Sequence, residues 1–540
     1  MVPCAAMSMR FWVVSMVLAG AACGDDAAGS ATDSGTSSGG ESTSSGEVPT
    51  TTIVTVPTSG DDTTGPPLAC TPGVQIDCTS CPGEQVGKQE CVEDGSGYGE
   101  CMCPGDVCGD GVVGGGEACD DGVNDGGYGG CAQDCSAPGP SCGDGVVNGP
   151  EACDDGNAVD GDGCNVDCVE SGSEVWTVGY GGEDAGNARA RGVAVDGSGN
   201  VIVVGEEFVV GQNANVWLRK YTPEGEVLWS RGWDGPSSGD DIAYAVAVTA
   251  EDDYVVTGEQ YQAGEGADIF VERWAPDGTS IWKQSHSSDS GLGDRGFGVA
   301  VAEDGTIAVT GEEYKLIGLH NVWTRLMDGD GTEIWTTVYD ANAGNDRGNA
   351  VAFDAKGDVY VAGEIYVPIG LSDLWLRKQS GADGAEVWTR TMDNMAGNDA
   401  WHAVAVDKDG NIGLVGEVYE VNGLSAIVIS KLNASGFPIW TNYQDSDGGD
   451  NDIGHGVAFD LEGNMVAVGE EYTANDFARV WVRKYDPKGD ELWTQIFDGQ
   501  DAGNDIGWAV AVEPGGYIYV AGEEYAVGQF AEVWLRKYAP

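Results

Sequence analysis

The chain has 540 residues, and its 89 acidic against 25 basic side chains give a formal net charge of −64 at pH 7. Before residue 170 the only basic side chains are those of Arg10 and Lys88. A surface this acidic repels polyanions, so we expect neither nucleic acid nor anionic lipid headgroups as partners. It suits Ca²⁺ binding or a salty medium, and solubility is the simpler explanation.

The chain opens with a targeting pattern. Arg10 precedes an apolar run over residues 11–20, and small residues follow. This order is typical of a secretory signal peptide, and the run is too short to span a bilayer as a mature helix. We therefore predict a signal peptide over residues 1–23.

The end of this segment carries a cysteine, Cys23, after Gly-Ala-Ala. The ending resembles a bacterial lipoprotein signal, although the usual leucine lies further upstream, at Leu18. The resemblance implies lipidation of Cys23 and contact with a membrane through the lipid anchor only; the alternative is ordinary cleavage after Ala22. By resemblance to bacterial sorting rules, Gly24 implies the outer membrane. We expect a cell-envelope location, anchored to the outer membrane or cell surface.

Residues 24–69 are rich in Ser, Thr, Gly, Asp and Pro. Such a composition cannot bury a core, so we predict a disordered linker.

Residues 70–168 contain fourteen cysteines. An even, dense set in a secreted chain predicts a disulfide framework. We expect a Cys-rich knot over 70–107 and two disulfide-rich repeats over 108–170, each with Cys-Gly-Asp-Gly-Val-Val and Glu-Ala-Cys-Asp-Asp-Gly motifs. Four cysteines allow three connectivities, and the sequence does not choose among them. A zinc site at Cys78-Thr-Ser-Cys81 is the alternative, but an oxidising compartment favours disulfides. The repeats resemble those of myxobacterial surface lipoproteins.

Residues 171–540 consist of a repeat marked by a tryptophan and a Gly-Glu pair. The tryptophans recur every 52 or 53 residues, at Trp176, Trp229, Trp282, Trp335, Trp388, Trp440 and Trp493. Each unit contains four short period-2 runs, rich in β-branched and aromatic residues and separated by turn residues, which predict four strands. Four strands in a repeat of this length predict a β-propeller blade. The segment Gly199–Gly205 is similar to bacterial extracellular propeller repeats of the Gly-Asn-apolar-Val-x-Gly type.

The blade count and the ring closure follow from the two ends of the repeat region. The seventh unit stops at Pro540 after its third strand, and an unmatched fourth strand, Glu174–Thr177, precedes the first unit. Pairing the two would protect both open edges. We therefore predict an all-β fold with a seven-bladed β-propeller that is closed by its N-terminal strand.

Two sets of charged residues repeat with the blades. Glu206 and its equivalents are open to interpretation as a ring of catalytic or metal-binding carboxylates, but we expect each to pair with the strand-C lysine of its own blade, such as Lys220. The third blade has Leu326 at the lysine position.

The second set is an aspartate just before the first strand of six blades: Asp241, Asp294, Asp346, Asp399, Asp452 and Asp505. An aspartate there commonly caps a turn by accepting backbone N–H groups. The alternative is Ca²⁺ coordination, the one cofactor that we consider.

One position varies while its neighbours are nearly all small. It holds Arg191, Tyr244, Phe297, Asn349, His402, His455 and Trp508. It lies on the first, innermost strand, so we expect a ring of these side chains at the mouth of the central channel, on the face of the long loops. Two histidines, an arginine, an asparagine and three aromatics favour a ligand site. The alternative is a position that faces a neighbouring blade or water.

No His-Glu-x-x-His or phosphate-loop motif occurs in the chain, and we expect no Gly-x-Ser-x-Gly nucleophile elbow. We therefore expect a non-catalytic cell-surface lipoprotein, monomeric, that binds a protein, glycan or small molecule through its long-loop face. One alternative is a lyase or hydrolase that uses His402 and His455. The other is a structural component of the cell envelope.

Overall fold

The computed structural model divides the chain into residues Met1–Ala69 and Cys70–Pro540. It describes residues 70, 73–78, 87–92, 96–99, 108, 111, 113, 117–124, 126–182 and 187–540, the last range with short gaps at 265, 289–290, 316–318, 342–343, 368–370, 393–396, 420–423, 447–450, 473–476, 500–502 and 526–530. The predicted signal peptide, Cys23 and the predicted linker lie outside the described residues. Within the described residues, no helix is long and apolar enough to cross a membrane.

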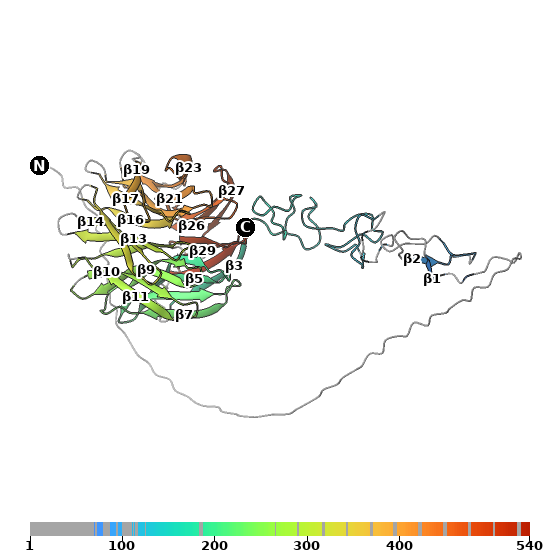
Figure 1. Cartoon of the computed structure of the whole chain (residues 1–540), viewed down its shortest axis with the longest axis horizontal. Helices are drawn as coiled ribbons and strands as arrows, with labels where there is room; N and C mark the ends of the chain where they lie inside the picture. The colour runs from blue at the N-terminus through green and yellow to red at the C-terminus, as the bar shows by residue number, and fades with distance from the viewer. Residues whose placement is uncertain are drawn as a thin grey trace, which may run out of the picture. The chain divides into compact units, whose positions relative to one another are not determined.

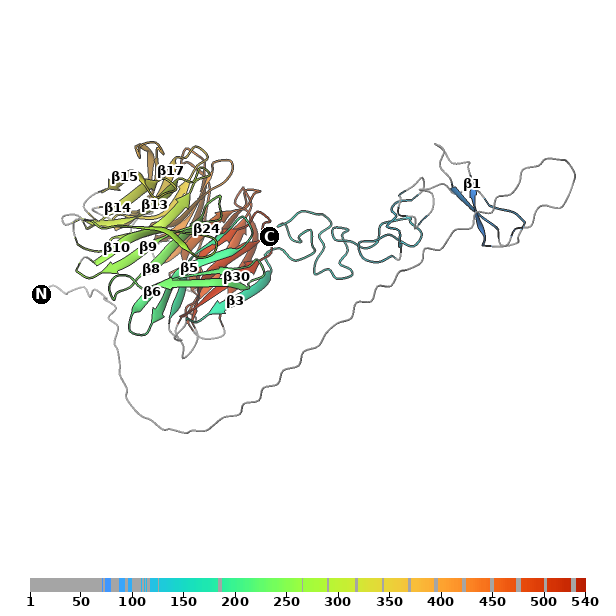
Figure 2. The same cartoon turned by 60° about the horizontal axis from the view of Figure 1, so that its bottom comes forward.

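Seven four-stranded antiparallel sheets make up the propeller, and we name their strands A to D from the centre outward (Figures 1 and 2). The A strands of neighbouring blades contact one another around the ring. Blade one consists of β4 (Ala188–Val195), β5 (Val201–Val209), β6 (Asn213–Tyr221) and β7 (Val227–Trp233). Blade two consists of β8 (Ile242–Val248), β9 (Tyr254–Gln262), β10 (Gly266–Trp274) and β11 (Ser280–His286). Blade three consists of β12 (Arg295–Val301), β13 (Ile307–Lys315), β14 (Leu319–Met327) and β15 (Glu333–Tyr339).

The remaining blades repeat this order. Blade four consists of β16 (Arg347–Phe353), β17 (Val359–Tyr366), β18 (Ser372–Gln379) and β19 (Glu386–Met392). Blade five consists of β20 (Ala400–Val406), β21 (Ile412–Tyr419), β22 (Ser425–Leu432) and β23 (Pro438–Gln444). Blade six consists of β24 (Ile453–Phe459), β25 (Met465–Tyr472), β26 (Ala478–Tyr485) and β27 (Glu491–Phe497).

The seventh blade is built from both ends of the propeller sequence, which confirms the predicted closure. It consists of β28 (Ile506–Val512), β29 (Ile518–Tyr525), β30 (Ala531–Tyr538) and β3 (Glu174–Tyr180). The strand β3 pairs antiparallel with β30, with Val178 opposite Leu535, and Figure 2 shows these strands side by side. The strand β3 thus covers the outer edge of β30, which blade seven would otherwise leave unpaired.

The core lies between neighbouring sheets. The B and C strands are buried on both faces, and on one face Val203 and Trp217 of blade one pack against Ala521 and Leu535 of blade seven. The sheets are covered on both faces by their neighbours, and strands buried on both faces become continuous apolar runs, as in Val201–Val204.

The predicted pairing of the Gly-Glu glutamates with the strand-C lysines is wrong. In the β5–β6 register Glu206 lies opposite Val216, whereas Lys220 lies opposite Ile202, at the far end of the hairpin. Lys220 instead pairs with Asp196, in the turn between strands A and B, at 2.9 Å. Equivalent pairs join Lys378 to Asp354, Lys431 to Asp407, Lys484 to Asp460 and Lys537 to Glu513.

The two Cys-rich repeats have the same disulfide connectivity. In the first repeat Cys108–Cys135 encloses Cys119–Cys131. In the second repeat Cys142–Cys168 encloses Cys153–Cys164. This nested pattern is one of the three connectivities that the sequence left open. In the predicted knot Cys70 is bonded to Cys91, beside the hairpin of β1 (Gln75–Cys78) and β2 (Gly87–Glu90), and Cys78 is disulfide-bonded, which removes it as a zinc thiolate.

Candidate functional site

The seven variable residues converge on the axis of the propeller. They alone line one pocket of about 230 Å³. A second pocket of about 210 Å³ is lined by the same residues together with the next two residues of each A strand. We call the set the central ring: Arg191, Tyr244, Phe297, Asn349, His402, His455 and Trp508. The sequence placed these side chains at the channel mouth, and the structure brings all seven together; ligand binding there stays a prediction.

A β-bulge explains why these positions vary. In blade three Gly296 pairs with Gly311 and Gly298 pairs with Thr310, so Phe297 is an extra residue without a cross-strand partner. The same register shift occurs between strands A and B of every other blade. A bulge re-aims its extra side chain and frees it from the demands of the ladder. The fold therefore requires no particular side chain at the bulge, whose neighbours are small except for Trp401 in blade five.

The seven glutamates of the Gly-Glu pairs form a layer of carboxylates next to the central ring. Five ring residues place a polar atom within 3.4 Å of the Oε1 of their own blade's glutamate. These pairs are Arg191–Glu206, Tyr244–Glu259, His402–Glu417, His455–Glu470 and Trp508–Glu523. The glutamates therefore fix the orientation of the ring side chains, a role that the sequence analysis missed because it assigned these carboxylates to the lysines.

Three arginines of strand A connect glutamates of adjacent blades. In blade three the Nε of Arg295 lies 2.7 Å from Glu259 and its Nη1 lies 2.8 Å from Glu312. Arg347 joins Glu312 to Glu364 in the same way. The sequence contained a signal for these bridges, because each arginine stands two residues before a ring residue. In the structure each of them pairs with the glutamate of the Gly-Glu motif.

The first arginine bridge spans the closing seam. Arg189 joins Glu523 of blade seven to Glu206 of blade one, at 2.6 and 3.3 Å. Blades one and seven are therefore connected by ion pairs next to the central ring, in addition to the strand β3 at the outer edge of blade seven.

Aromatic side chains cover much of the ring. The Trp508 ring lies between the Arg191 guanidinium, at 4.5 Å, and the His455 imidazole, at 4.3 Å between centroids. Tyr244 packs against Phe297 at 5.2 Å. Stacking and cation–π contacts of this kind hold planar groups in place and favour planar or cationic ligands.

The two ring histidines are neighbours and each has a carboxylate partner. The His402 and His455 ring centroids are 5.9 Å apart. Each Nε2 lies 3.4 Å from its glutamate, Glu417 or Glu470. Burial alone would raise the pKa of Glu417, but the hydrogen bond and the charge of His402 outweigh it and lower that pKa.

Elsewhere in the layer burial dominates. It raises the pKa of Glu259 above its usual range, against the opposing effect of Arg295, and it raises the pKa of the Tyr244 hydroxyl that donates to Glu259.

The aspartates before the A strands lie away from the ring and accept backbone N–H groups. Asp294 accepts from Ser288 at 2.5 Å and from Tyr314 on strand B at 2.8 Å. The strand-B N–H of the other blades is accepted at 2.7–3.1 Å by Asp241, Asp346, Asp399, Asp452 and Asp505. These bonds are those that the capping alternative requires, whereas Ca²⁺ binding by these aspartates stays a prediction.

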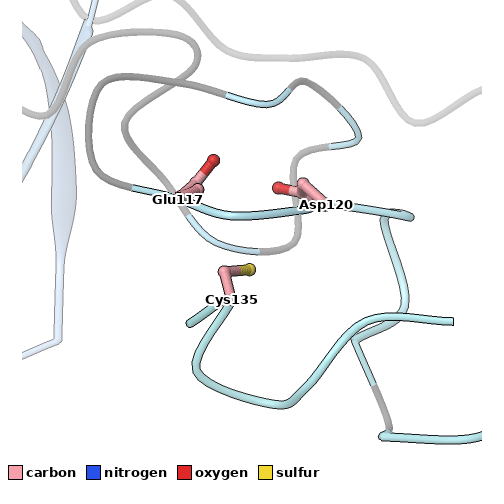
Figure 3. Close-up of side chains that lie close together, drawn as sticks. All are labelled: Glu117, Asp120 and Cys135. Atoms are coloured by element: carbon pink, nitrogen blue, oxygen red, sulfur yellow. The ribbon is translucent and has the colours of Figure 1, made fainter. Parts of the chain in front are cut away.

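The Cys-rich repeats contain two groups of acidic and cysteine side chains. Glu117, Asp120 and Cys135 lie close together (Figure 3), and Glu151, Asp154 and Cys168 are arranged alike in the second repeat. Both cysteines are bonded in disulfides, so neither offers a thiolate to a metal. The Asp154 carboxylate accepts N–H groups from Gly143, Asp144, Gly145 and Gly156, which identifies it as a structural cap.

Comparison with known proteins adds no functional assignment. No protein-family model and no curated protein matches the chain. Similar solved structures include a protein of unknown function from Dyadobacter fermentans, with 11% identity, a TM-score of 0.39 and coverage of 69% of this chain and 100% of that one. A quinohemoprotein alcohol dehydrogenase from Comamonas testosteroni has 10% identity, a TM-score of 0.39 and coverage of 68% and 76%. A gluconolactonase from Xanthomonas campestris has 14% identity, a TM-score of 0.32 and coverage of 66% and 88%. Similarities this distant carry no argument about activity.

Proposed function

We propose that this protein is a lipid-anchored binding protein of the cell envelope, and that its propeller takes up a small ligand, or one group of a protein or glycan partner, in the pocket of the central ring. One observation carries the proposal: the bulge residue of strand A, which differs in chemistry between blades, lines a common pocket in all seven blades. Other repeated side chains are engaged in capping, ion pairs or packing. A pocket whose lining residues vary while the surrounding strands repeat is suited to selective binding.

Glycan, peptide and small-molecule arrays that are probed with the full chain test this proposal. We expect a hit whose affinity falls at least tenfold in Phe297→Ala, which opens the ring. The matched control is Phe437→Ala, because Phe437 is exposed in the turn before β23, away from the ring. Silence on all arrays, or an equal effect of the two variants, would favour the structural-component alternative.

The neighbouring histidines support a second candidate, an enzyme that uses His402 and His455 as an acid–base pair. Two imidazoles whose centroids are 5.9 Å apart, each beside a carboxylate, are close enough to serve one bound substrate. The double variant His402→Ala/His455→Ala separates the candidates. Lost turnover with retained binding supports the enzyme, whereas lost binding with no turnover in the parent chain supports the binding protein.

The proposed location rests on residues 1–23 and on the disulfides. Five disulfides among the described cysteines suit an oxidising, extracytoplasmic compartment. We expect Cys23→Ser to release the protein from the membrane fraction and to abolish metabolic labelling with a fatty acid. A membrane-bound Cys23→Ser variant would contradict the lipid anchor and leave the pocket proposal intact.

A further inference from the structure

Arginines bridge the carboxylate layer in three of the seven blades. In blades one, three and four, the strand-A residue opposite the glutamate is an arginine, whose Nε contacts the preceding blade's glutamate and whose Nη1 contacts its own. In blade five the same position is Ala400, which pairs with Glu417 in the ladder. In blades two, six and seven it is an isoleucine, Ile242, Ile453 or Ile506, so Ala400 is the one small side chain at this register. Among the residues that the structure describes, no guanidinium therefore bridges Glu364 to Glu417 or Glu417 to Glu470.

The carboxylates that flank Ala400 are the most exposed of the layer. The Glu364 and Glu417 side chains are 20% and 23% exposed, whereas each of the other five is at most 11% exposed. Glu364 shares Arg347 with Glu312, at the longer distance of 3.5 Å. The gap between these two glutamates is thus the place where the layer combines negative charge with access from solvent.

A buried oxygen on the next blade indicates that this arc of the layer lacks a cation. Glu470 is 5% exposed, and its Oε2 has no hydrogen-bond partner, while His455 lies beside its Oε1. An unpaired buried carboxylate oxygen is costly, and a nearby positive charge relieves that cost. Over the whole layer seven carboxylates face the four guanidiniums of Arg189, Arg191, Arg295 and Arg347, so the ring is negatively charged when its histidines are neutral.

We propose that the ligand of the central ring carries a guanidinium group, which bridges Glu364 and Glu417 beside Ala400, where the chain has no arginine of its own. The inference rests on the proposed function, because the rest of the ligand lies in the central pocket beside Asn349 and His402. A planar guanidinium fits two carboxylates with a fork of N–H donors, as Arg295 and Arg347 do in the preceding blades. The group belongs either to a free small molecule or to an arginine side chain of a protein partner.

Isothermal titration of the full chain with agmatine, and separately with a short arginine-containing peptide, tests the inference. We expect one or both to bind, and 1,4-butanediol, a neutral analogue of the agmatine chain, not to bind. Binding by agmatine identifies a free molecule as sufficient, whereas binding by the peptide alone identifies a protein partner. Ala400→Arg, which supplies the missing guanidinium from the chain itself, should weaken binding at least tenfold.

The matched control is Ile242→Arg, the same type of substitution at the same register in blade two. There Glu206 already contacts Arg189 and Arg191, and Glu259 contacts Arg295, so this variant should bind as the parent chain does. Thermal unfolding of both variants verifies that they fold.

Three results would overturn the inference: no binding of either guanidinium probe, undiminished binding by Ala400→Arg, or equal losses in the two variants. An array hit that depends on Phe297 but not on Ala400→Arg would overturn it and leave the proposed function standing. A chain that binds nothing on the arrays would remove both.

Discussion

The indole N–H of Trp176 donates to the carbonyl oxygen of Pro223, 3.0 Å away, and so joins the closing strand of blade seven to the outer turn of blade one. The same bond links Trp229 to Pro276, Trp282 to Gly329, Trp335 to Gly381 and Trp440 to Pro487. The recurring tryptophan therefore makes a hydrogen bond between neighbouring blades as well as an apolar contact.

Trp176→Phe should destabilise the propeller modestly. The substitution keeps an aromatic ring but removes the N–H donor, and a hydrogen bond of this kind contributes about 1 kcal/mol. We expect the free energy of unfolding, measured by denaturant titration, to fall by about that amount. Trp493→Phe is the control, because the Trp493 Nε1 is buried without a hydrogen-bond partner. An equal loss of unfolding free energy in the two variants would show that the hydrogen bond between Trp176 and Pro223 adds no stability.

The buried pair of Lys431 and Asp407 should be far more sensitive to the loss of one partner than of both. The side chains are 3% and 2% exposed and lie 3.0 Å apart. Lys431→Leu leaves a buried carboxylate without its cation, which costs about 3–5 kcal/mol. Blade three shows that an apolar pair fits here, because Leu326 and Ala302 occupy the positions equivalent to Lys431 and Asp407. We therefore expect Asp407→Ala/Lys431→Leu to recover most of the unfolding free energy in denaturant titrations. A double variant as unstable as Lys431→Leu would contradict this explanation.

The repeat made most of the fold predictable. A period of 52–53 residues with four strand signals specifies blades. Their closure follows from a surplus strand before the first unit and a missing strand in the last unit. The side-chain partners within a blade were harder to predict, because they depend on the register of each hairpin. Glu206 and Lys220 are both on paired strands, yet they lie at opposite ends of the β5–β6 ladder. The substitution of Leu326 in blade three was the available clue, since it accompanies Ala302 and not a change of Glu312.

The central ring was predictable for a different reason. A position that varies while its neighbours are constrained carries a signal that needs no tertiary information. The bulge that frees Phe297, and the bridges that Arg295 and Arg347 make between blades, depend on ladder geometry and on contacts between sheets. The disulfide connectivity likewise needed coordinates, because Cys108 and its three companions allow three pairings.

The glycine opposite each bulge should not tolerate a side chain. A Cβ on Gly311 would lie 1.8 Å from the carbonyl oxygen of Arg295, a backbone atom that cannot move without breaking the ladder. Gly311→Ala should therefore lower the unfolding free energy by about 3 kcal/mol, as for severe overpacking, measured by denaturant titration. Gly179→Ala is the control, because its nearest neighbour, the Val533 carbonyl, would be 3.7 Å away. A loss in Gly179→Ala as large as that in Gly311→Ala would show that the close approach is not the cause.

Asp505 should make the stability of the propeller depend on pH between 5 and 7. Burial raises the pKa of this carboxyl to about 6, although N–H groups of Gly499 and Tyr525 oppose the shift. The native state then binds a proton more tightly than the unfolded chain does, so stability rises as the pH falls through 6 and is lost as the pH rises. Asp505→Asn cannot titrate. We therefore expect the unfolding free energy of the parent chain to increase relative to that of Asp505→Asn when thermal or denaturant unfolding is measured at pH 5 and not at pH 7.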